Sequence, residues 1–230
     1  MSSKTGWIGK ILKMGGGGGA EAMAAQRAAF EHRKERAMGK LLGHPHAYLF
    51  NEIVPEETVE VREFEGKVRG TGFGTVGMIE INGDGPLPNE HGMFELVMFT
   101  KAKRPEGFEV RFHAGDCTVQ DKAYYGLYIK AREIMSQVSV YAREKVIKPG
   151  DMIDIMLERE GLMYHVVFDE LHFKKRSFEV DGEHHELMLC MLVHQEEMDY
   201  GRMYGAEKLM DKLKQERLYP YSDLNREVLV

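Results

Sequence analysis

The sequence has few of the features that mark secreted, membrane-spanning or disulfide-bonded proteins. Its two cysteines, Cys117 and Cys190, are too few for a disulfide framework or a cysteine zinc site. No apolar run approaches the roughly 18–20 residues that cross a bilayer. The N-terminus has no long apolar segment followed by a small-residue cleavage site. We therefore expect a cytoplasmic protein without a transmembrane segment.

Motifs of common enzyme and cofactor sites are also missing. There is no Gly-x-Ser-x-Gly nucleophile elbow. The glycines at 15–19 lack the Gly-Lys-Ser/Thr ending of a phosphate-binding loop, and no helical pattern follows the glycines at 70–74 as a dinucleotide site requires. Cys117, beside Asp116, would act as a nucleophile only if a base such as His113 paired with it in space. We predict a protein that is not an enzyme and binds no cofactor.

Ten histidines raise the alternative of a metal site. The sequence contains no His-Glu-x-x-His motif, and the pairs His44/His46 and His184/His185 stand alone. Neighbours such as His184 and His185 point to opposite sides of a strand. We therefore expect turn or surface histidines and no metal.

Charge is divided unevenly along the chain. Residues 1–43 carry eight Lys and Arg against three Glu, a balance of +5. The remainder carries 31 − 8 = 23 basic and 37 − 3 = 34 acidic residues, a balance of −11. An acidic body argues against a nucleic-acid ligand. It is compatible with a basic protein partner.

The pattern divides the chain into two parts. Residues 1–43 read as a flexible, glycine-hinged segment with one helix, Ala20 to Leu42, that is rich in good helix formers. Gly43 and Pro45 end this helix, so we expect a surface or extension helix followed by a globular domain at 44–230. The short piece around Trp7 is amphipathic, and its role stays open.

In the globular part, the apolar pattern predicts one long helix and several strands. A capping-box spacing at Thr118 precedes an apolar face that runs to about Lys145, which predicts a helix. Alternating or continuous apolar runs predict strands at 59–64, 78–81, 93–100, 152–157, 164–168, 171–173 and 187–193. Residues 108–112 fit either a strand or a loop. The glycines at 70–74 favour close backbone approach within a sheet.

The stretch from Glu186 to Leu213 has the strongest pattern. Seven apolar residues form a strand covered on both faces. A helical face follows directly, consisting of Met198, Gly201, Gly205, Leu209 and Leu213. Glycine in a helix interior costs roughly 1 kcal/mol against alanine, so we expect close packing of this face to compensate.

Three acidic residues are placed by these elements. Glu95 is the lone charge in the strand at 93–100, and it either turns toward solvent or is a buried carboxylate with a partner. Glu196 and Glu197 stand at a helix start, where the helix dipole favours negative charge. None of the three requires a catalytic role.

Three segments, in this order, resemble the Suppressor of fused family, especially its bacterial members. Thr75-Val76-Gly77-Met78 and the following strand Phe94 to Phe99 are similar to the family's Thr-x-Gly-Met segment and its Glu-Leu strand. Ala131 to Ile155 resembles the family's helix, loop and Gly-Asp strand entry. Leu189 to Leu213 resembles its hydrophobic strand, helix start and helical glycine, with His194 in place of the usual capping threonine. The likeness spans about residues 46–215.

The resemblance implies an α+β domain with a central mixed sheet and flanking helices that acts by binding protein. It implies an immunity protein that neutralises a partner toxin, because bacterial members resemble such proteins. An acidic body would suit a basic toxin. The alternative is an intracellular regulator or scaffold that binds a peptide segment at a sheet edge. Partner-binding candidates in the matched motifs are Thr75, Met78, Glu95, Glu196 and Glu197.

Overall fold

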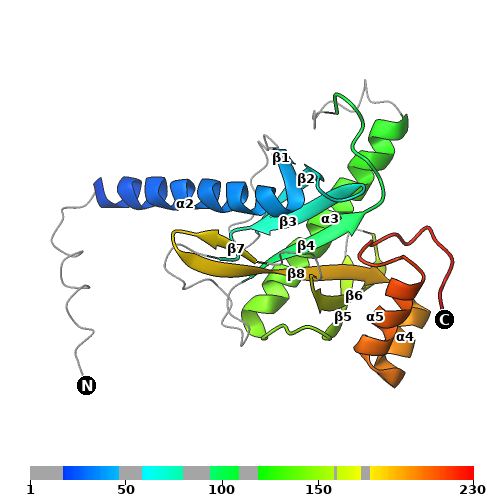
Figure 1. Ribbon diagram of the computed structural model, residues 1–230. Helices are drawn as coiled ribbons and strands as arrows, with labels where there is room; N and C mark the ends of the chain where they lie inside the picture. Colours follow the sequence, from blue (N-terminus) through cyan, green and yellow to red (C-terminus); the bar gives the residue numbers. More distant parts are fainter. Residues whose placement is uncertain (1–17, 47–58, 80–93, 109–118, 158–159, 172–176) are drawn as a thin grey trace, which may run out of the picture.

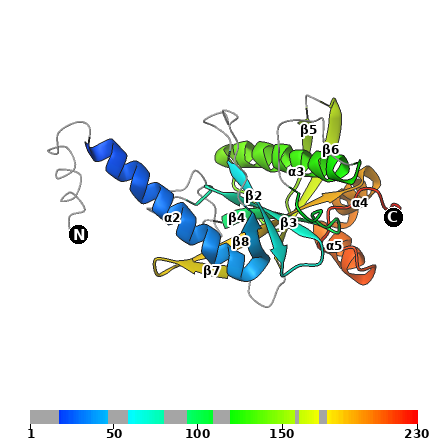
Figure 2. The same cartoon turned by 90° about the horizontal axis from the view of Figure 1, so that it is seen from above.

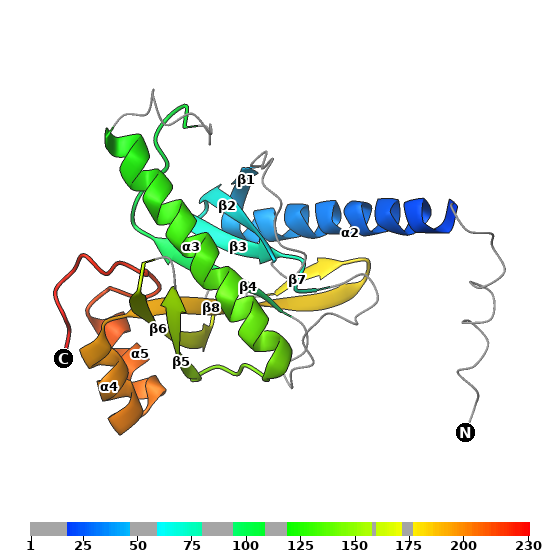
Figure 3. The ribbon, with the colours of Figure 1, turned by 180° about the vertical axis from the view of Figure 1, so that it is seen from behind.

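One eight-stranded mixed sheet lies between two layers of helices (Figure 1). The computed structural model describes residues 18–46, 59–79, 94–108, 119–157, 160–171 and 177–230. Helix α3 covers one face of the sheet, and α2, α4 and α5 pack on the other face (Figures 2 and 3). This arrangement confirms the predicted α+β class with a central mixed sheet and flanking helices.

The sheet has the strand order β1-β2-β3-β4-β8-β6-β5, and β7 pairs with the first part of β8. Among the described strands, β4 and β8 pair in parallel and the other neighbours pair antiparallel. The strands are β1 Gly43–His46, β2 Glu60–Gly66, β3 Thr71–Val76, β4 Phe94–Thr100, β5 Met152–Leu157, β6 Leu162–Glu170, β7 Ser177–Val180 and β8 Glu183–Val193. Strand β8 therefore contacts three other strands and organises the sheet.

Four helices complete the described fold. They are α2 Gly18–Leu42, α3 Val119–Glu144, α4 Gln195–Tyr204 and α5 Ala206–Gln215. Helix α3 begins directly after the predicted capping-box position and ends within a residue of its expected end. None of the described helices is long and apolar enough to cross a membrane.

The central strands are buried on both faces and divide their side chains between two cores. In β4, Leu96 and Met98 join the core beneath α3, while Val97 and Phe99 join the core shared with α2, α4 and α5. Strand β8 alternates in the same way, with Cys190 on the α3 side. A continuous apolar run is the pattern expected of a strand covered on both sides.

Helix α2 has two halves with different environments. The described side chains up to Ala29 are exposed, which agrees with the predicted N-terminal extension. From Phe30 onward, Lys34, Met38 and Leu42 are buried among the strands and the β7–β8 hairpin. The second half is therefore part of the core and not the surface helix that its alanine-rich sequence suggested. Its large side chains recur at four-residue steps and form one buried stripe.

The prediction of a single helix after β8 is wrong, because the structure has two helices with a break at Gly205. Gly205 adopts φ +100° and ψ 142°, which ends α4, and α5 begins at the next residue. Gly205 is exposed and needs its glycine for this backbone conformation. Gly201 meets the expectation of close packing, because an added Cβ would lie 2.9 Å from Met152 Sδ and 3.1 Å from Leu209 Cδ2.

Several local predictions differ from the structure or lie outside the described residues. Gly70 meets the expectation of close backbone approach, because an added Cβ would lie 2.0 Å from the main-chain oxygen of Thr100, whereas Gly72 and Gly74 make room for the rings of Phe99 and Phe64. Residues 77–79 form a bend instead of the strand expected at 78–81. His185 is buried, 4% exposed, and not a surface residue. Residues 80–81, 109–112 and 172–173 lie outside the described residues, and so does Cys117, whose pairing with a base was the condition for a nucleophile.

Candidate functional site

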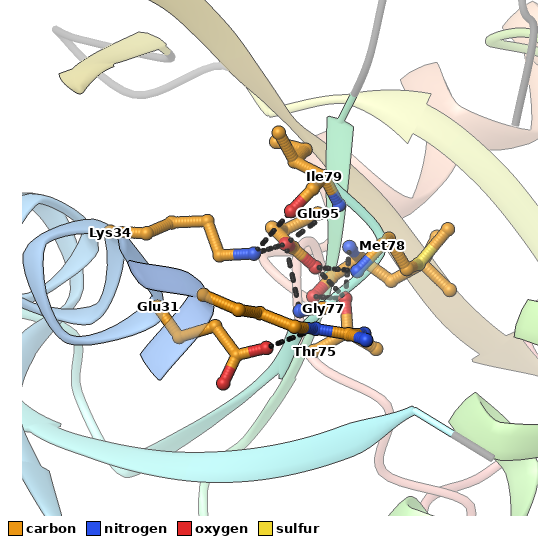
Figure 4. Close-up of polar contacts among 9 residues, drawn as sticks. Glu31, Lys34, Thr75, Gly77, Met78, Ile79 and Glu95 are labelled. Carbon is orange, nitrogen blue, oxygen red and sulfur yellow. Dashed lines mark hydrogen bonds and ion pairs between the residues drawn. The ribbon is translucent and has the colours of Figure 1, made fainter. Parts of the chain in front are cut away.

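Glu95 is buried in the sheet and is surrounded by hydrogen-bond donors (Figure 4). The Thr75 hydroxyl donates to Oε2 at 2.7 Å. The main-chain N–H groups of the bend after β3 also donate, Gly77 and Ile79 to Oε1 at 3.1 and 3.2 Å and Met78 to Oε2 at 3.3 Å. The bend turns three consecutive amides toward one carboxylate, so this piece of chain is held around Glu95. This settles the two alternatives for Glu95 in favour of a buried carboxylate with partners.

The cationic partner of Glu95 comes from α2. Lys34 Nζ lies 2.7 Å from Glu95 Oε1 and donates to the carbonyl oxygen of Ile79 at 2.8 Å. Both charged side chains are 0% exposed. A buried ion pair is tolerated only when further hydrogen bonds satisfy its atoms, as they do here. The sequence offered no partner for Glu95, since Lys34 lies 61 residues earlier in a helix expected at the surface.

A second buried carboxylate, Glu197, lies at the start of α4. It accepts a hydrogen bond from the main-chain N–H of His194 at 3.0 Å, the reciprocal half of a capping box. Arg226 donates from Nη1 to Oε1 at 2.5 Å and from Nη2 to Oε2 at 2.6 Å. The main-chain N–H of Leu229 donates to Oε1 at 3.1 Å. Burial alone raises the pKa of Glu197. The Arg226 guanidinium and the two amides outweigh burial and hold that pKa below its ordinary value.

Arg226 belongs to the C-terminal segment, residues 221–230, which adds to the sheet where β4 and β8 separate. The two strands pair in parallel from Phe94 opposite Glu186 to Val97 opposite Leu189. Farther along, the N–H of Ser222 donates to the carbonyl oxygen of Phe99 at 2.7 Å, and the N–H of Leu192 donates to Ser222 Oγ at 3.0 Å. Residue 221 forms a parallel bridge with Phe99. The segment thus takes the place of a strand between β4 and β8.

A groove of about 710 Å³ adjoins this point, on the α3 side of the sheet. Its apolar wall includes Phe73, Met98, Leu127 and Leu192 from the sheet and α3. Residues 222–225 of the C-terminal segment form another side. A groove next to an incompletely paired pair of strands offers both apolar contacts and main-chain partners, which is what an extended peptide needs.

A third buried carboxylate, Glu63 of β2, lies behind the groove wall. Tyr124, which lines the groove, donates its hydroxyl to Glu63 Oε1 in a short hydrogen bond and lies 3.2 Å from Thr71 Oγ1. Arg104 Nη1 is 3.8 Å from the other oxygen. Burial raises the pKa of Glu63 to about 7, against the opposing effects of Tyr124 and Arg104. The sequence contained a signal for this burial, because Glu63 has the same strand parity as buried Val61.

The structure separates the predicted partner-binding residues into two places. Thr75, Met78 and Glu95 meet at the bend after β3, and Glu197 lies at the C-terminal segment. All four are buried, at 0–1% exposure, so they support the fold and its attached segments from within. Glu196 is exposed, and its role stays a prediction. Lys34 and Arg226 were missed because only the tertiary structure brings them to these carboxylates, and Ser222 was missed because only the tertiary structure places it between β4 and β8.

Elsewhere in the described part of the chain, polar side chains form no recognisable metal site. No group of three or more His, Cys, Asp and Glu side chains there is arranged to hold a metal ion. Burial raises the pKa of the Cys190 thiol well above its ordinary value. A thiol that is buried and protonated is a poor nucleophile. Cys190 is therefore a core side chain.

No protein-family model and no curated protein matches the chain. Solved structures do match it. One is a chain of a structure described as the Sufu-Fu complex, with 12% identity, coverage of 82% of this chain and 83% of that chain, and a TM-score of 0.45. Another is the crystal structure of Drosophila Suppressor of Fused, with 12% identity, coverage of 68% of this chain and 38% of that chain, and a TM-score of 0.42. The likeness is one of fold, to structures of the family that the sequence motifs resemble.

Proposed function

We propose that this chain is a protein-binding domain that takes an extended segment of a basic partner. The observation that carries the proposal is the site between β4 and β8. There the carbonyl oxygen of Phe99 and the N–H of Leu192 both form hydrogen bonds with Ser222, which belongs to no named strand. An apolar groove lies beside this point. Main-chain bonds supply affinity to an added strand, and adjoining pockets supply its specificity.

We further propose that the partner is a toxin domain and that this chain is a cytoplasmic immunity protein, without enzymatic activity, that neutralises it. The support is the acidic balance of −11 over residues 44–230, which would attract a basic partner. The sequence resemblance to bacterial Suppressor of fused proteins points the same way. The alternative, a regulator or scaffold that binds a peptide segment at a sheet edge, would use the same site.

The test is co-expression with a toxin domain encoded beside this chain. We expect the chain to restore growth and to purify in a complex with the toxin. Neither rescue nor a complex would refute the immunity role. A partner that binds at the groove but does not impair growth when expressed alone would favour the regulator or scaffold.

Two matched variants test whether the groove is the binding surface. Ala123 is exposed and lines the groove, so Ala123→Arg would fill it with a bulky cation that repels a basic segment. Tyr125 is 37% exposed on the same helix and does not line the groove. We expect Ala123→Arg to weaken the complex at least tenfold and Tyr125→Arg to leave it unchanged. Equal affinities for both variants would move the binding surface away from the groove.

A further inference from the structure

We propose that the C-terminal segment, residues 221–230, is a displaceable internal occupant of the partner site. We infer that the partner segment carries a serine or threonine followed four residues later by an arginine. The inference rests on the proposed peptide-binding function and names the chemistry that this site selects. It uses the chain's own segment as a template for the ligand.

Two anchors hold the segment. The first is Ser222, which is 7% exposed and bridges Phe99 of β4 and Leu192 of β8 through its main-chain N–H and its hydroxyl. A small hydroxyl side chain accepts the Leu192 N–H at this buried position, whereas an apolar side chain would leave that donor unpaired. Serine or threonine is therefore the residue that the gap between the strands accepts.

The second anchor is the arginine four positions later. Arg226 places two nitrogens on the oxygens of Glu197, and the Glu197 side chain is 0% exposed. A guanidinium matches a carboxylate in this paired geometry, and a lysine ammonium does not. Glu197 therefore selects arginine over lysine.

Between and beyond these anchors the segment has one side in solvent and one side on the protein. Asn225, Glu227, Val228 and Val230 are exposed, and Val228 and Val230 expose 40% and 41% of their surface. Tyr221, Leu224 and Leu229 are partly buried and pack against the two cores, so a segment that replaces residues 221–230 must cover the same apolar surface. The groove beside residues 222–225 leaves room for an incoming chain to make its first contacts before the segment leaves. A partner segment would then replace the hydrogen bonds of Ser222 to Phe99 and Leu192, and the ion pair of Arg226 with Glu197, by equivalent bonds of its own.

The test uses the full chain and a labelled synthetic peptide with the sequence of residues 219–230. Arg226→Ala removes the guanidinium from Glu197 and releases that anchor of the C-terminal segment, while the chain keeps its full length. By fluorescence anisotropy, we expect this variant to bind the peptide at least tenfold more tightly than the wild-type chain, whose own segment competes. A peptide with alanine at the arginine position should bind the same variant at least tenfold more weakly.

Equal binding of the peptide by wild type and Arg226→Ala, or no binding by either, would overturn the proposal. Concentration-dependent dimers of Arg226→Ala would also overturn it, since the occupant would then be the segment of a second copy. Circular dichroism checks that the variant is folded. If it is not, Arg226→Lys retains one charge and should still bind the peptide about threefold more tightly than wild type, and failure to do so would count against the proposal. The assay contains no toxin, so its outcome is independent of the immunity role.

Discussion

Glu95 and Glu197 both hold a distant segment of chain against the sheet, but the two segments differ in how else they are attached. Lys34 lies within a helix whose neighbours Phe30 and Met38 are buried in the core. Arg226 lies in a segment whose large apolar side chains, Tyr221, Leu224 and Leu229, are only partly buried. The same ion-pair chemistry thus fixes a helix permanently in one region and fastens a removable segment in the other. The difference lies in apolar burial around the cation and not in the pair itself.

Removing the α2 cation should produce the largest loss of stability. Lys34→Met keeps the length of the side chain and leaves Glu95 buried without its charge partner, so we expect the free energy of unfolding to fall by about 3–5 kcal/mol. Urea denaturation measures it. Lys40 is exposed near the end of the same helix, and Lys40→Met should change stability by less than about 0.5 kcal/mol. A loss below about 1 kcal/mol for Lys34→Met would show that the Lys34–Glu95 ion pair does not hold α2 on the sheet.

Glu63 is a buried carboxylate with a weaker ion pair than Glu95 or Glu197. Its Oε2 lies 3.8 Å from Nη1 of Arg104. Its pKa of about 7 exceeds that of an unfolded glutamate, so the folded chain binds the extra proton. The associated stability is present below about pH 4.5 and is lost as pH rises through 7, by at most about 3 kcal/mol.

Glu63→Gln should therefore remove a decline in unfolding free energy between pH 5 and 8, measured by urea titrations at each pH. Glu106 is exposed, and Glu106→Gln should preserve the decline. Parallel pH profiles for wild type and Glu63→Gln would contradict the raised pKa of Glu63.

Arg226→Ala should destabilise the chain less than Lys34→Met does. The freed segment can swing away and admit water to Glu197, which still has the His194 amide, so we expect a loss of about 1–3 kcal/mol in urea. The exposed Lys208 in α5 provides the control Lys208→Ala, with little expected change.

The same variant has a pH signature with a defined sign. Because Arg226 helps to hold the pKa of Glu197 below its ordinary value, this stabilisation is present above the unfolded pKa and is lost as pH falls through the folded pKa. The gap between wild type and Arg226→Ala should therefore shrink on acidification below about pH 4. A gap that stays constant in acid would exclude the ion pair as its source.

The smallest effect is expected at the other anchor of the C-terminal segment. Ser222→Ala removes the acceptor for the Leu192 N–H and keeps the main-chain bond to Phe99, so we expect a loss of about 1 kcal/mol. Hydrogen exchange at the Leu192 amide should accelerate as well. Asn225→Ala, at an exposed position in the same segment, should leave both measurements unchanged.

Local patterns predicted the elements better than their connections. The apolar run at 187–193 and the periodic face of α3 identified a central strand and a long helix, because burial imposes those periods. The same reasoning extended one helix through Gly205, since a helical spacing of residues continues across a break that only backbone angles reveal. In α2 the alanine-rich sequence concealed a buried stripe of four larger residues.

The candidate site was predicted only in part for a related reason. Glu95 and Glu197 stood out as charges beside or within apolar segments, which the sequence displays directly. Their partners could not be identified, because Lys34 and Arg226 look like ordinary basic residues of a helix and a terminal segment. Pairing across 61 and 29 residues depends on where strands and helices lie in space.

The resemblance of three segments to the Suppressor of fused family implied the α+β class. The sequence by itself determined the long helix, the buried central strand, the acidic body and the positions where charge interrupts apolar runs. These follow from local periodicity and composition, which each stretch of chain carries independently. Only the tertiary structure decided that Glu95 fixes α2, that Glu197 holds residues 221–230 and that this segment bridges β4 and β8. A buried carboxylate must find a cation and donors, and folding in three dimensions selects which ones it meets.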